Sequence, residues 1–369
     1  MVLVKAKRDE LLEPLSAVSG IIERRHTLPI LSNVLIDRDD TSLSFLATDI
    51  EIQITARSAL QQSGEARALT VGARKLVDIL RALPDGSEVT LQQQDKRLLV
   101  KAGKSRFSLQ TLPADDFPRI ARTSAGEAAR FTLPQRALRK LLSLVQYAMA
   151  QQDIRYYLNG LLMVVEDRQL KLAATDGHRL AYASTALEAD LQRQEVIVPR
   201  KTVIELGKLL AESDDEIRIE LSATQAVFGF GSIELVSKLV DGKFPDYTRV
   251  IPTQHKNHLK LEREALRQAL MRAAILSNEK FRGVRWVLSD GSLKIASSNA
   301  EQEEAQEEID VTYSGDTIDI GFNVNYLLDV LNNVSGGEIE CHFGDSASSA
   351  LMTFASDPEF KYVVMPMRI

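Results

Sequence analysis

One short segment carries an acid and a base close enough together to suggest catalysis. Asp176-Gly177-His178-Arg179 places a carboxylate two residues before an imidazole, and such pairs serve in general acid–base hydrolysis. No serine or cysteine in a nucleophile setting accompanies the pair. A polar loop beside Leu180 is therefore the favoured interpretation, a hydrolase using Asp176 and His178 is the alternative, and no catalytic residue is predicted.

Patterns for binding phosphate or metal are weak. Gly103-Lys104-Ser105 resembles the end of a phosphate loop, but Leu98 stands where the first glycine belongs. His255 and His258 lie in an expected linker without cysteine or acidic residues nearby, and Cys341-His342 is an isolated pair. Surface or packing roles are favoured for both pairs, so neither a metal nor a cofactor is expected.

The composition indicates a globular chain of several domains. It has 369 residues, of which 44% are hydrophobic and 26% charged, so two or three domains are expected and extensive disorder is excluded. A single cysteine indicates a reducing compartment. The start of the chain lacks the apolar stretch of a signal peptide, and no apolar run approaches a membrane span. A net charge of −6 would by itself argue against nucleic acid.

Internal repeats divide the chain into thirds. Ala47-Thr48-Asp49 recurs as Ala174-Thr175-Asp176, and Phe117-Pro118 recurs as Phe244-Pro245, each 127 residues later. A fainter third copy follows, in which Lys294–Ser298 resembles Lys171–Thr175. We therefore expect domains at residues 1–125, 126–253 and 254–369, with linkers near 121–129 and 252–258.

Each repeat reads as helix, strands, helix, strands. Leu138, Leu141, Leu142 and Val145 follow helical spacing within an expected helix from Gln135 to Ala150. Asp290-Gly291 between two apolar runs predicts a hairpin turn, and alternating runs elsewhere predict half-buried strands. This succession favours an α+β fold with antiparallel sheets. Second helices are expected to start near Gly72, Pro199 and Asn323.

Basic residues concentrate in the six expected helices. The windows 5–25, 72–81, 135–152, 199–210, 262–277 and 323–334 together carry +8, which leaves −14 for the rest of the chain. Solvated helix surfaces would explain any one helix, but repeated basic helices favour a surface for a polyanion. The candidates from this pattern are Arg136, Arg139, Lys140 and Lys201. The last window has no basic residue, so any contact from it would need an asparagine.

Two expected strands in the first and last repeats carry opposite charges. Residues 97–106 contain Lys104 and Arg106 without an acid, and residues 301–310 contain Glu301, Glu303 and Glu304 without a base. Strand edges invite pairing, and opposite charges at opposite ends favour head-to-tail association, which closes into a ring if the geometry allows. Two solvated strands are the alternative.

The chain end, Tyr362–Ile369, is unusually apolar and holds two methionines. Methionine suits surfaces that accept several partners, whereas the alternative is a final strand packed in the third domain.

Several stretches resemble the bacterial sliding clamp family, the beta subunits of DNA polymerase III, over essentially the whole chain. They are Thr27–Leu35, Asp153–Gly160, Ala174–Leu180, Ser237–Tyr247, Ala274–Arg285 and the tail Tyr362–Arg368. The resemblance implies three similar domains per chain and a head-to-tail homodimeric ring with helices lining the hole. It implies a non-enzymatic processivity factor, and a protein scaffold that does not bind DNA is a further alternative against which the basic helices argue.

The resemblance also implies which residues act. DNA contacts carry over to Arg25, Arg74, Gln152, Tyr156 and Tyr157, and the dimer seam to Phe107, Leu109, Ile275 and Leu276. A cleft that accepts partner peptides carries over to Leu158, Thr175, Gly177, His178, Arg179, Leu180, Pro245, Arg249, Val250, Asn323, Tyr326, Ser349, Val363, Met365, Pro366, Met367 and Arg368.

The partners implied are duplex DNA without sequence preference, a second copy of the chain, the polymerase III catalytic subunit, the clamp loader, and other polymerases and repair proteins, but no membrane. The expected location is the bacterial cytoplasm, with nucleoid association during replication.

Overall fold

The computed structural model describes residues 1–23, 28–60, 65–123 and 128–368. It divides into two compact units, each considered by itself: residues 1–136 with 204–239, and residues 137–203 with 240–369. All strand pairs are antiparallel and helices interrupt the strands, so the predicted α+β class is confirmed. In the described residues, no helix is both long and apolar enough to cross a membrane.

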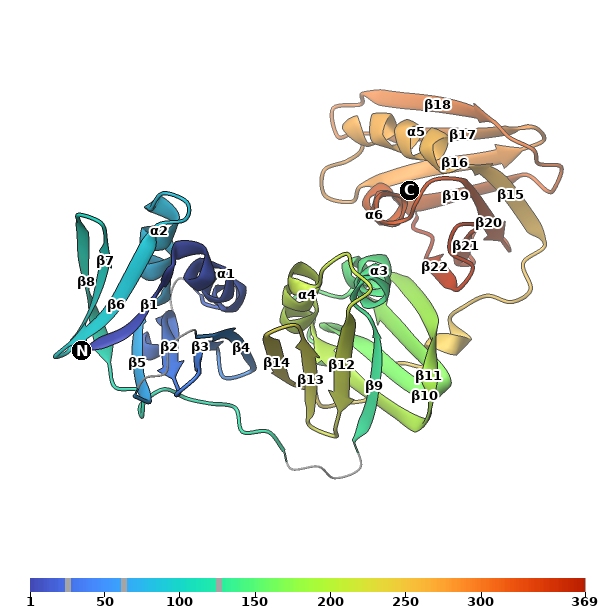
Figure 1. Ribbon diagram of the computed structural model, residues 1–369. Helices are drawn as coiled ribbons and strands as arrows, with labels where there is room; N and C mark the ends of the chain where they lie inside the picture. Colours follow the sequence, from blue (N-terminus) through green and yellow to red (C-terminus); the bar gives the residue numbers. More distant parts are fainter. Residues whose placement is uncertain (24–27, 61–64, 124–127, 369) are drawn as a thin grey trace. The chain divides into compact units, whose positions relative to one another are not determined.

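The first unit contains a twelve-stranded sheet in the order β1-β6-β7-β8-β5-β2-β3-β4-β14-β13-β12-β9 (Figure 1). Its strands are β1 Val2–Lys7, β2 Asn33–Arg38, β3 Ser42–Thr48, β4 Ile52–Ala59, β5 Arg67–Gly72, β6 Glu88–Gln94, β7 Arg97–Ala102, β8 Ser105–Leu112, β9 Ala129–Pro134, β12 Glu216–Leu221, β13 Gln225–Phe230 and β14 Ile233–Lys238. Helices α1 (Arg8–Ser19) and α2 (Ala73–Ala82) pack together and bury apolar residues at helical spacing. Strand β4 of the first repeat pairs with β14 of the second.

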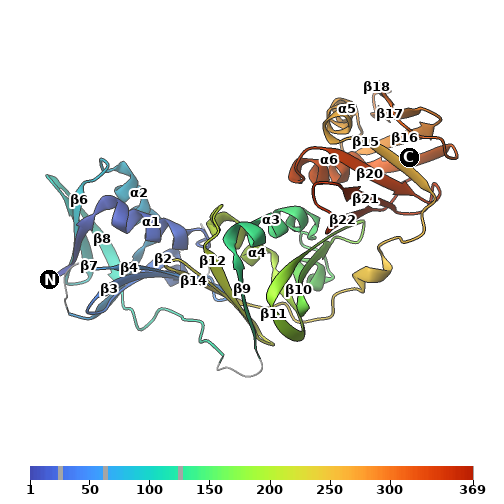
Figure 2. The ribbon, with the colours of Figure 1, turned by 45° about the vertical axis from the view of Figure 1, so that its right-hand side comes forward.

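The second unit contains a six-stranded sheet, β10-β11-β22-β21-β20-β15, and a four-stranded sheet, β18-β17-β16-β19. Its strands are β10 Gly160–Thr175, β11 Arg179–Pro199, β15 Asn257–Glu262, β16 Gly283–Ser289, β17 Ser292–Ser298, β18 Glu304–Asp310, β19 Ile318–Asn323, β20 Glu338–Phe343, β21 Ala350–Phe354 and β22 Phe360–Val364. Helix α5 (Arg263–Ile275) packs against β17 and β18 and beside α6 (Val324–Asn333), as Figures 1 and 2 show. Helices α3 (Gln135–Val145) and α4 (Arg200–Leu209) contribute residues to both units.

The turns follow from local sequence. Asp290-Gly291 forms the predicted hairpin between β16 and β17, with Gly291 at φ 72°. Gly103-Lys104 forms the equivalent turn between β7 and β8, where Gly103 has φ 54° and Ala102 pairs with Ser105. The resemblance of Gly103-Lys104-Ser105 to a phosphate loop therefore reflects a hairpin.

Three expected boundaries were wrong. The first helix is shorter than residues 5–25 because Val2–Lys7 pairs with β6 as a strand. The helix expected from Gln135 to Ala150 leaves α geometry after Val145 and tightens into a 3-10 turn at Gln146–Ala148. The second linker ends before His258, which lies inside β15.

The repeated Ala-Thr-Asp motif builds the same turn twice. Thr175 donates its hydroxyl to the carbonyl of Arg179 at 2.5 Å, and the Asp176 carboxylate accepts from the backbone N–H groups two and three residues later. Thr48 and Asp49 make the corresponding bonds after β3. The next residue has positive φ in both copies, 71° at Ile50 and 90° at Gly177, so the repeat encodes a strand-to-strand turn.

Candidate functional site

Three of the residues predicted to form the partner-peptide cleft belong to an apolar cluster in the second unit. Leu158, Leu180 and Val363 are at most 2% exposed and pack with Leu162, Phe244 and neighbouring apolar side chains. These residues come from the turn before β10, from β11 and from β22, and strand pairing places Leu180 opposite Val363. They form the floor of the site, because too little of each is exposed to contact a partner extensively.

The chain end crosses this floor and joins two sheets. Beyond β22, the N–H of Met365 donates to the carbonyl of His178 at 2.8 Å, and the N–H of Met367 donates to the carbonyl of Gly321 at 2.9 Å. The Met365 side chain remains 47% exposed and that of Val250 45%. The tail is therefore both a packed strand and a source of exposed apolar surface, which combines the two interpretations of residues 362–369.

Arg179, which the resemblance assigns to the partner-peptide cleft, has a largely buried side chain. Its side chain is 9% exposed and bridges the Asp176 and Asp329 carboxylates at 3.1 and 2.6 Å. It also donates to the carbonyl of Tyr147 at 2.6 Å, and its guanidinium lies 4.4 Å from the Tyr326 ring centroid. Burial would lower the pKa of Arg179, but nearby Tyr362, Asp329 and Asp176 outweigh it and raise that pKa. Arg179 thus fastens β11 to α6.

The acid–base alternative finds no support in this geometry. The carboxylate of Asp176 accepts hydrogen bonds from the backbone of His178 and from the side chain of Arg179, so it is committed to the turn. His178 itself is exposed next to the tail.

Of the other residues predicted for the partner-peptide cleft, some are held by hydrogen bonds and others are exposed. Asn323 caps α6 by accepting from the N–H of Asn325, the Tyr326 carbonyl accepts from the Tyr362 hydroxyl, and the Ser349 carbonyl lies 2.8 Å from Nε2 of His255. The exposed positions are Gly177, His178, Pro245, Arg249, Val250, Met365 and Arg368, while Thr175, Pro366 and Met367 are half-buried. We name the exposed positions together with Pro366 and Met367 the partner surface.

A loop after α3 carries the predicted aromatic DNA contacts. Gln152 has φ 55°, Tyr156 is 57% exposed, and the rings of Tyr156 and Tyr157 meet edge to face with centroids 5.9 Å apart. Arg155 hydrogen-bonds to Asp153 and holds the pKa of that carboxyl at about 2. Ile154, which sequence reasoning missed, is 97% exposed in this loop. Its exposure could not be predicted, because a single apolar residue among polar ones forms no periodic pattern.

The basic residues predicted to contact DNA differ in their ion-pair partners and in their exposure. Arg136 pairs with Asp214 at 2.8 Å, and both side chains are well exposed. Lys140 pairs with Asp357, whose side chain is only 6% exposed. Arg74 is exposed and donates to the carbonyl of Ile22, while Lys201 is half-buried and Arg139 exposed. Arg25 lies outside the described residues.

The two oppositely charged strands both have accessible edges. Among the described residues, β8 pairs along its length with β7 but meets β5 only through Thr111 and Leu112. Strand β18 is the last strand of its sheet. Phe107 and Leu109 are half-buried on β8, and Lys104 and Arg106 are exposed. Glu301, Glu303 and Glu304 are exposed at or before the start of β18.

Exposed apolar residues gather at the end of α5. Ile275, a predicted seam residue, is 76% exposed, and Leu276 is half-buried. Met271 and Phe281, at 45% and 57%, add to this apolar surface and were not predicted. Both lie near Ile275 in sequence, and only their exposure distinguishes them from core residues.

A hollow of about 300 Å³ lies beside β8 in the first unit. Leu109 and Gln110 line it together with Ile22, Asn33, Gly72, Arg74 and Lys75. It therefore brings a predicted seam residue, Leu109, next to a predicted DNA contact, Arg74.

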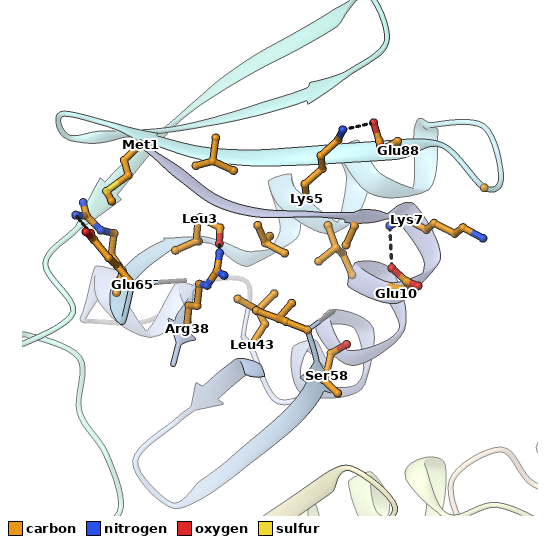
Figure 3. A pocket seen from close by; sticks show the side chains of 18 residues that line it. Met1, Leu3, Lys5, Lys7, Glu10, Arg38, Leu43, Ser58, Glu65 and Glu88 are labelled. Carbon is orange, nitrogen blue, oxygen red and sulfur yellow. Dashed lines mark hydrogen bonds and ion pairs between the residues drawn. The ribbon is translucent and has the colours of Figure 1, made fainter. Parts of the chain in front are cut away.

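A larger hollow of about 560 Å³ lies between β1, α1 and the end of β4 (Figure 3). Its charged side chains largely pair with one another, Lys5 with Glu88 at 3.1 Å and Arg67 with Glu65 at 3.7 Å. Leu60 and Glu65 border residues 61–64, which lie outside the described part of the chain. None of the predicted site residues lines this hollow.

Comparisons with known proteins agree along the whole chain. Residues 3–121, 132–246 and 248–368 match the N-terminal, central and C-terminal domains of the DNA polymerase III beta subunit. The chain is 48% identical to the beta sliding clamp of Escherichia coli K12 over 363 residues, covering 98% of this chain and 99% of that protein.

Solved structures agree as well. The crystal structure of the DNA polymerase III subunit beta from Pseudomonas aeruginosa is 46% identical, covers both chains completely and superimposes with a TM-score of 0.96. A structure of the sliding clamp from the same organism bound to griselimycin is equally similar, at 46% identity and TM-score 0.96 with complete coverage of both chains.

Proposed function

Because the chain belongs to the DNA polymerase III beta subunit family of sliding clamps, we propose that two copies join head to tail into a ring around duplex DNA. The protein is a non-catalytic processivity factor of DNA replication with three clamp domains. The match of all three domains carries the proposal. We place the domain boundaries near residues 125 and 253, and the site of action in the bacterial cytoplasm.

The seam of the ring would join β8 of one copy to β18 of the other. Both strands have accessible edges, and basic Lys104 and Arg106 would face an acidic strand that begins at Glu304. Main-chain hydrogen bonds across the two edges would extend the sheet. Ile275, whose side chain is largely exposed in the single chain, would be buried against Phe107, Leu109 and the hollow beside them.

DNA would be held through phosphates without base recognition. Sliding requires loose attraction that is equal for every sequence, and basic side chains on helices provide it. Arg136 is a stronger candidate than Lys140, since a phosphate that replaced Asp357 would leave a buried carboxylate without its lysine. Tyr156, Tyr157 and Gln152 would add contacts from the loop after α3, and Arg25, Arg74, Arg139 and Lys201 complete the proposed set.

Replication proteins would share the partner surface. Exposed Val250 and Met365, with half-buried Met367, provide apolar anchorage above the buried floor of Leu158, Leu180 and Val363. A short extended peptide with aliphatic and aromatic side chains fits such a surface. The polymerase III catalytic subunit, the clamp loader, other polymerases and repair proteins are the proposed partners.

The decisive experiment loads the protein with a clamp loader onto nicked circular DNA and separates bound from free protein by gel filtration. A ring held by topology stays on the circle and leaves after a restriction enzyme cuts the DNA once. Retention that persists on linear DNA at the same salt concentration would show that contacts, and not encirclement, hold the protein.

A further inference from the structure

A cluster of two histidines and a glutamate, none of them among the predicted site residues, lies on one face of β15 and β20. Antiparallel pairing places His258 of β15 directly opposite His342 of β20. Glu340 lies two residues before His342 and therefore on the same face of the strand. Ile339, Cys341 and Phe343, on the alternate positions of β20, are buried in the core.

The three side chains converge. The ligand atoms that they offer all lie within 4.8 Å of one another, and Nδ1 of His258 lies 3.1 Å from Oε1 of Glu340. The two imidazole rings meet edge to face with centroids 4.7 Å apart. Neighbouring Lys260 pairs instead with Glu338, at 3.7 Å.

Nε2 of each imidazole ring already has a hydrogen-bond partner. Nε2 of His258 lies 3.0 Å from the carbonyl of His255, and Nε2 of His342 lies 3.0 Å from the hydroxyl of Thr353. A carbonyl only accepts, so Nε2 of His258 carries a hydrogen and its Nδ1 faces the carboxylate of Glu340 with a lone pair. Two lone pairs at that distance need a cation between them, either a proton or a metal ion. Metal-binding histidines typically bond their second nitrogen in this way.

We propose that His258, Glu340 and His342 form a binding site for a divalent transition metal, with Zn²⁺ as the matching ion. Two imidazoles and one carboxylate are a common zinc ligand set, and water would complete the tetrahedron. Strand β15 is the edge strand of its sheet and the first strand after the second linker. The ion would therefore fasten this edge to β20 and stabilise the third domain.

The experiment titrates ZnCl₂ into the full-length protein without an affinity tag, by isothermal titration calorimetry. One ion should bind per chain at this site. His342→Ala and Glu340→Gln should each weaken that binding at least about tenfold. His255→Ala is the matched control, because His255 contributes only its backbone carbonyl to the cluster and that carbonyl remains.

Two further measurements separate binding from folding. Bound Co²⁺ should show the visible absorption of tetrahedral coordination in the parent and in His255→Ala, but not in His342→Ala. Thermal melting in chelator should be alike for all variants, and Zn²⁺ should raise the melting temperature of the parent and of His255→Ala only. If the parent binds no zinc, or His342→Ala binds it as tightly as the parent, the pair His258–Glu340 holds only a proton and the proposal is wrong.

Discussion

At the scale of single residues, the Thr-Asp motif forms the same turn in two repeats but with a different residue at the position of positive φ. Thr48-Asp49 and Thr175-Asp176 make the same hydrogen bonds, and both turns need a residue at positive φ. The first copy places Ile50 there, and the second places Gly177, where an added Cβ would lie 2.9 Å from Nη2 of Arg155. Because Nη2 is the end of a flexible arginine side chain that can move aside, the glycine is needed mainly for backbone conformation.

Gly177→Ala should therefore lower the free energy of unfolding by about 1–3 kcal/mol, since a residue with a Cβ is strained at a φ of 90°. Urea unfolding measures this change. Gly229→Ala is the control, because Gly229 lies within β13 with ordinary φ and nothing within 4 Å of its added Cβ. That variant should be as stable as the parent or slightly more so. Equal stability of the two variants would contradict the conformational role of Gly177.

At the scale of elements, the tail after β22 couples two sheets through its backbone and leaves side chains for a partner. The N–H of Met365 bonds to the turn before β11 and that of Met367 bonds to β19, so shortening the tail would disturb folding as well as binding. A side-chain substitution separates the two effects.

Met365→Ala should leave stability nearly unchanged, within about 0.5 kcal/mol, because the side chain is half exposed. Binding of a labelled peptide from the polymerase III catalytic subunit should weaken about fivefold or more, as expected for an anchor residue at an interface. Fluorescence anisotropy measures the affinity. Met271→Ala changes a methionine of similar exposure on α5 and should bind the peptide like the parent. If Met365→Ala also binds like the parent, the tail does not anchor partners.

At the scale of the whole molecule, the proposed ring depends on surfaces that a single chain leaves exposed. In the described residues, β18 is the last strand of its sheet, β8 meets β5 only through its last two residues, and Ile275 presents an apolar side chain to solvent. Exposed edges of this kind favour aggregation unless a defined partner covers them.

Replacing Ile275 and Leu276 by alanine should convert the dimer to monomer. Burying these side chains across the seam should contribute a few kcal/mol, since large-to-small changes at packed sites cost roughly 2–5 kcal/mol each. Analytical ultracentrifugation at low micromolar concentration measures the change, and melting should show a folded monomer. Ile154→Ala removes an even more exposed isoleucine and should stay dimeric. A dimer that survives the double substitution would place the seam elsewhere.

The sequence by itself determined the features that neighbouring residues encode. Helical and alternating periodicity predicted the α+β class, and Asp290-Gly291 predicted its hairpin. The recurrence of Ala-Thr-Asp predicted repeats, and the structure shows that both copies of the motif form the same turn. Resemblance to a family supplied the site residues beyond these patterns. Boundaries such as the end of α3 were misplaced, because packing rather than propensity decides where a helix ends.

Tertiary structure alone decided which distant residues meet. No local pattern indicates that Arg179 is buried, yet the structure places it at the start of β11 beside Asp329 of α6 and largely buries its side chain. His258 and His342 were interpreted as two separate surface pairs, and only the register of β15 against β20 places them with Glu340. Local periodicity indicates which face of a strand is buried, but it does not say which segments far apart in the chain pair with one another.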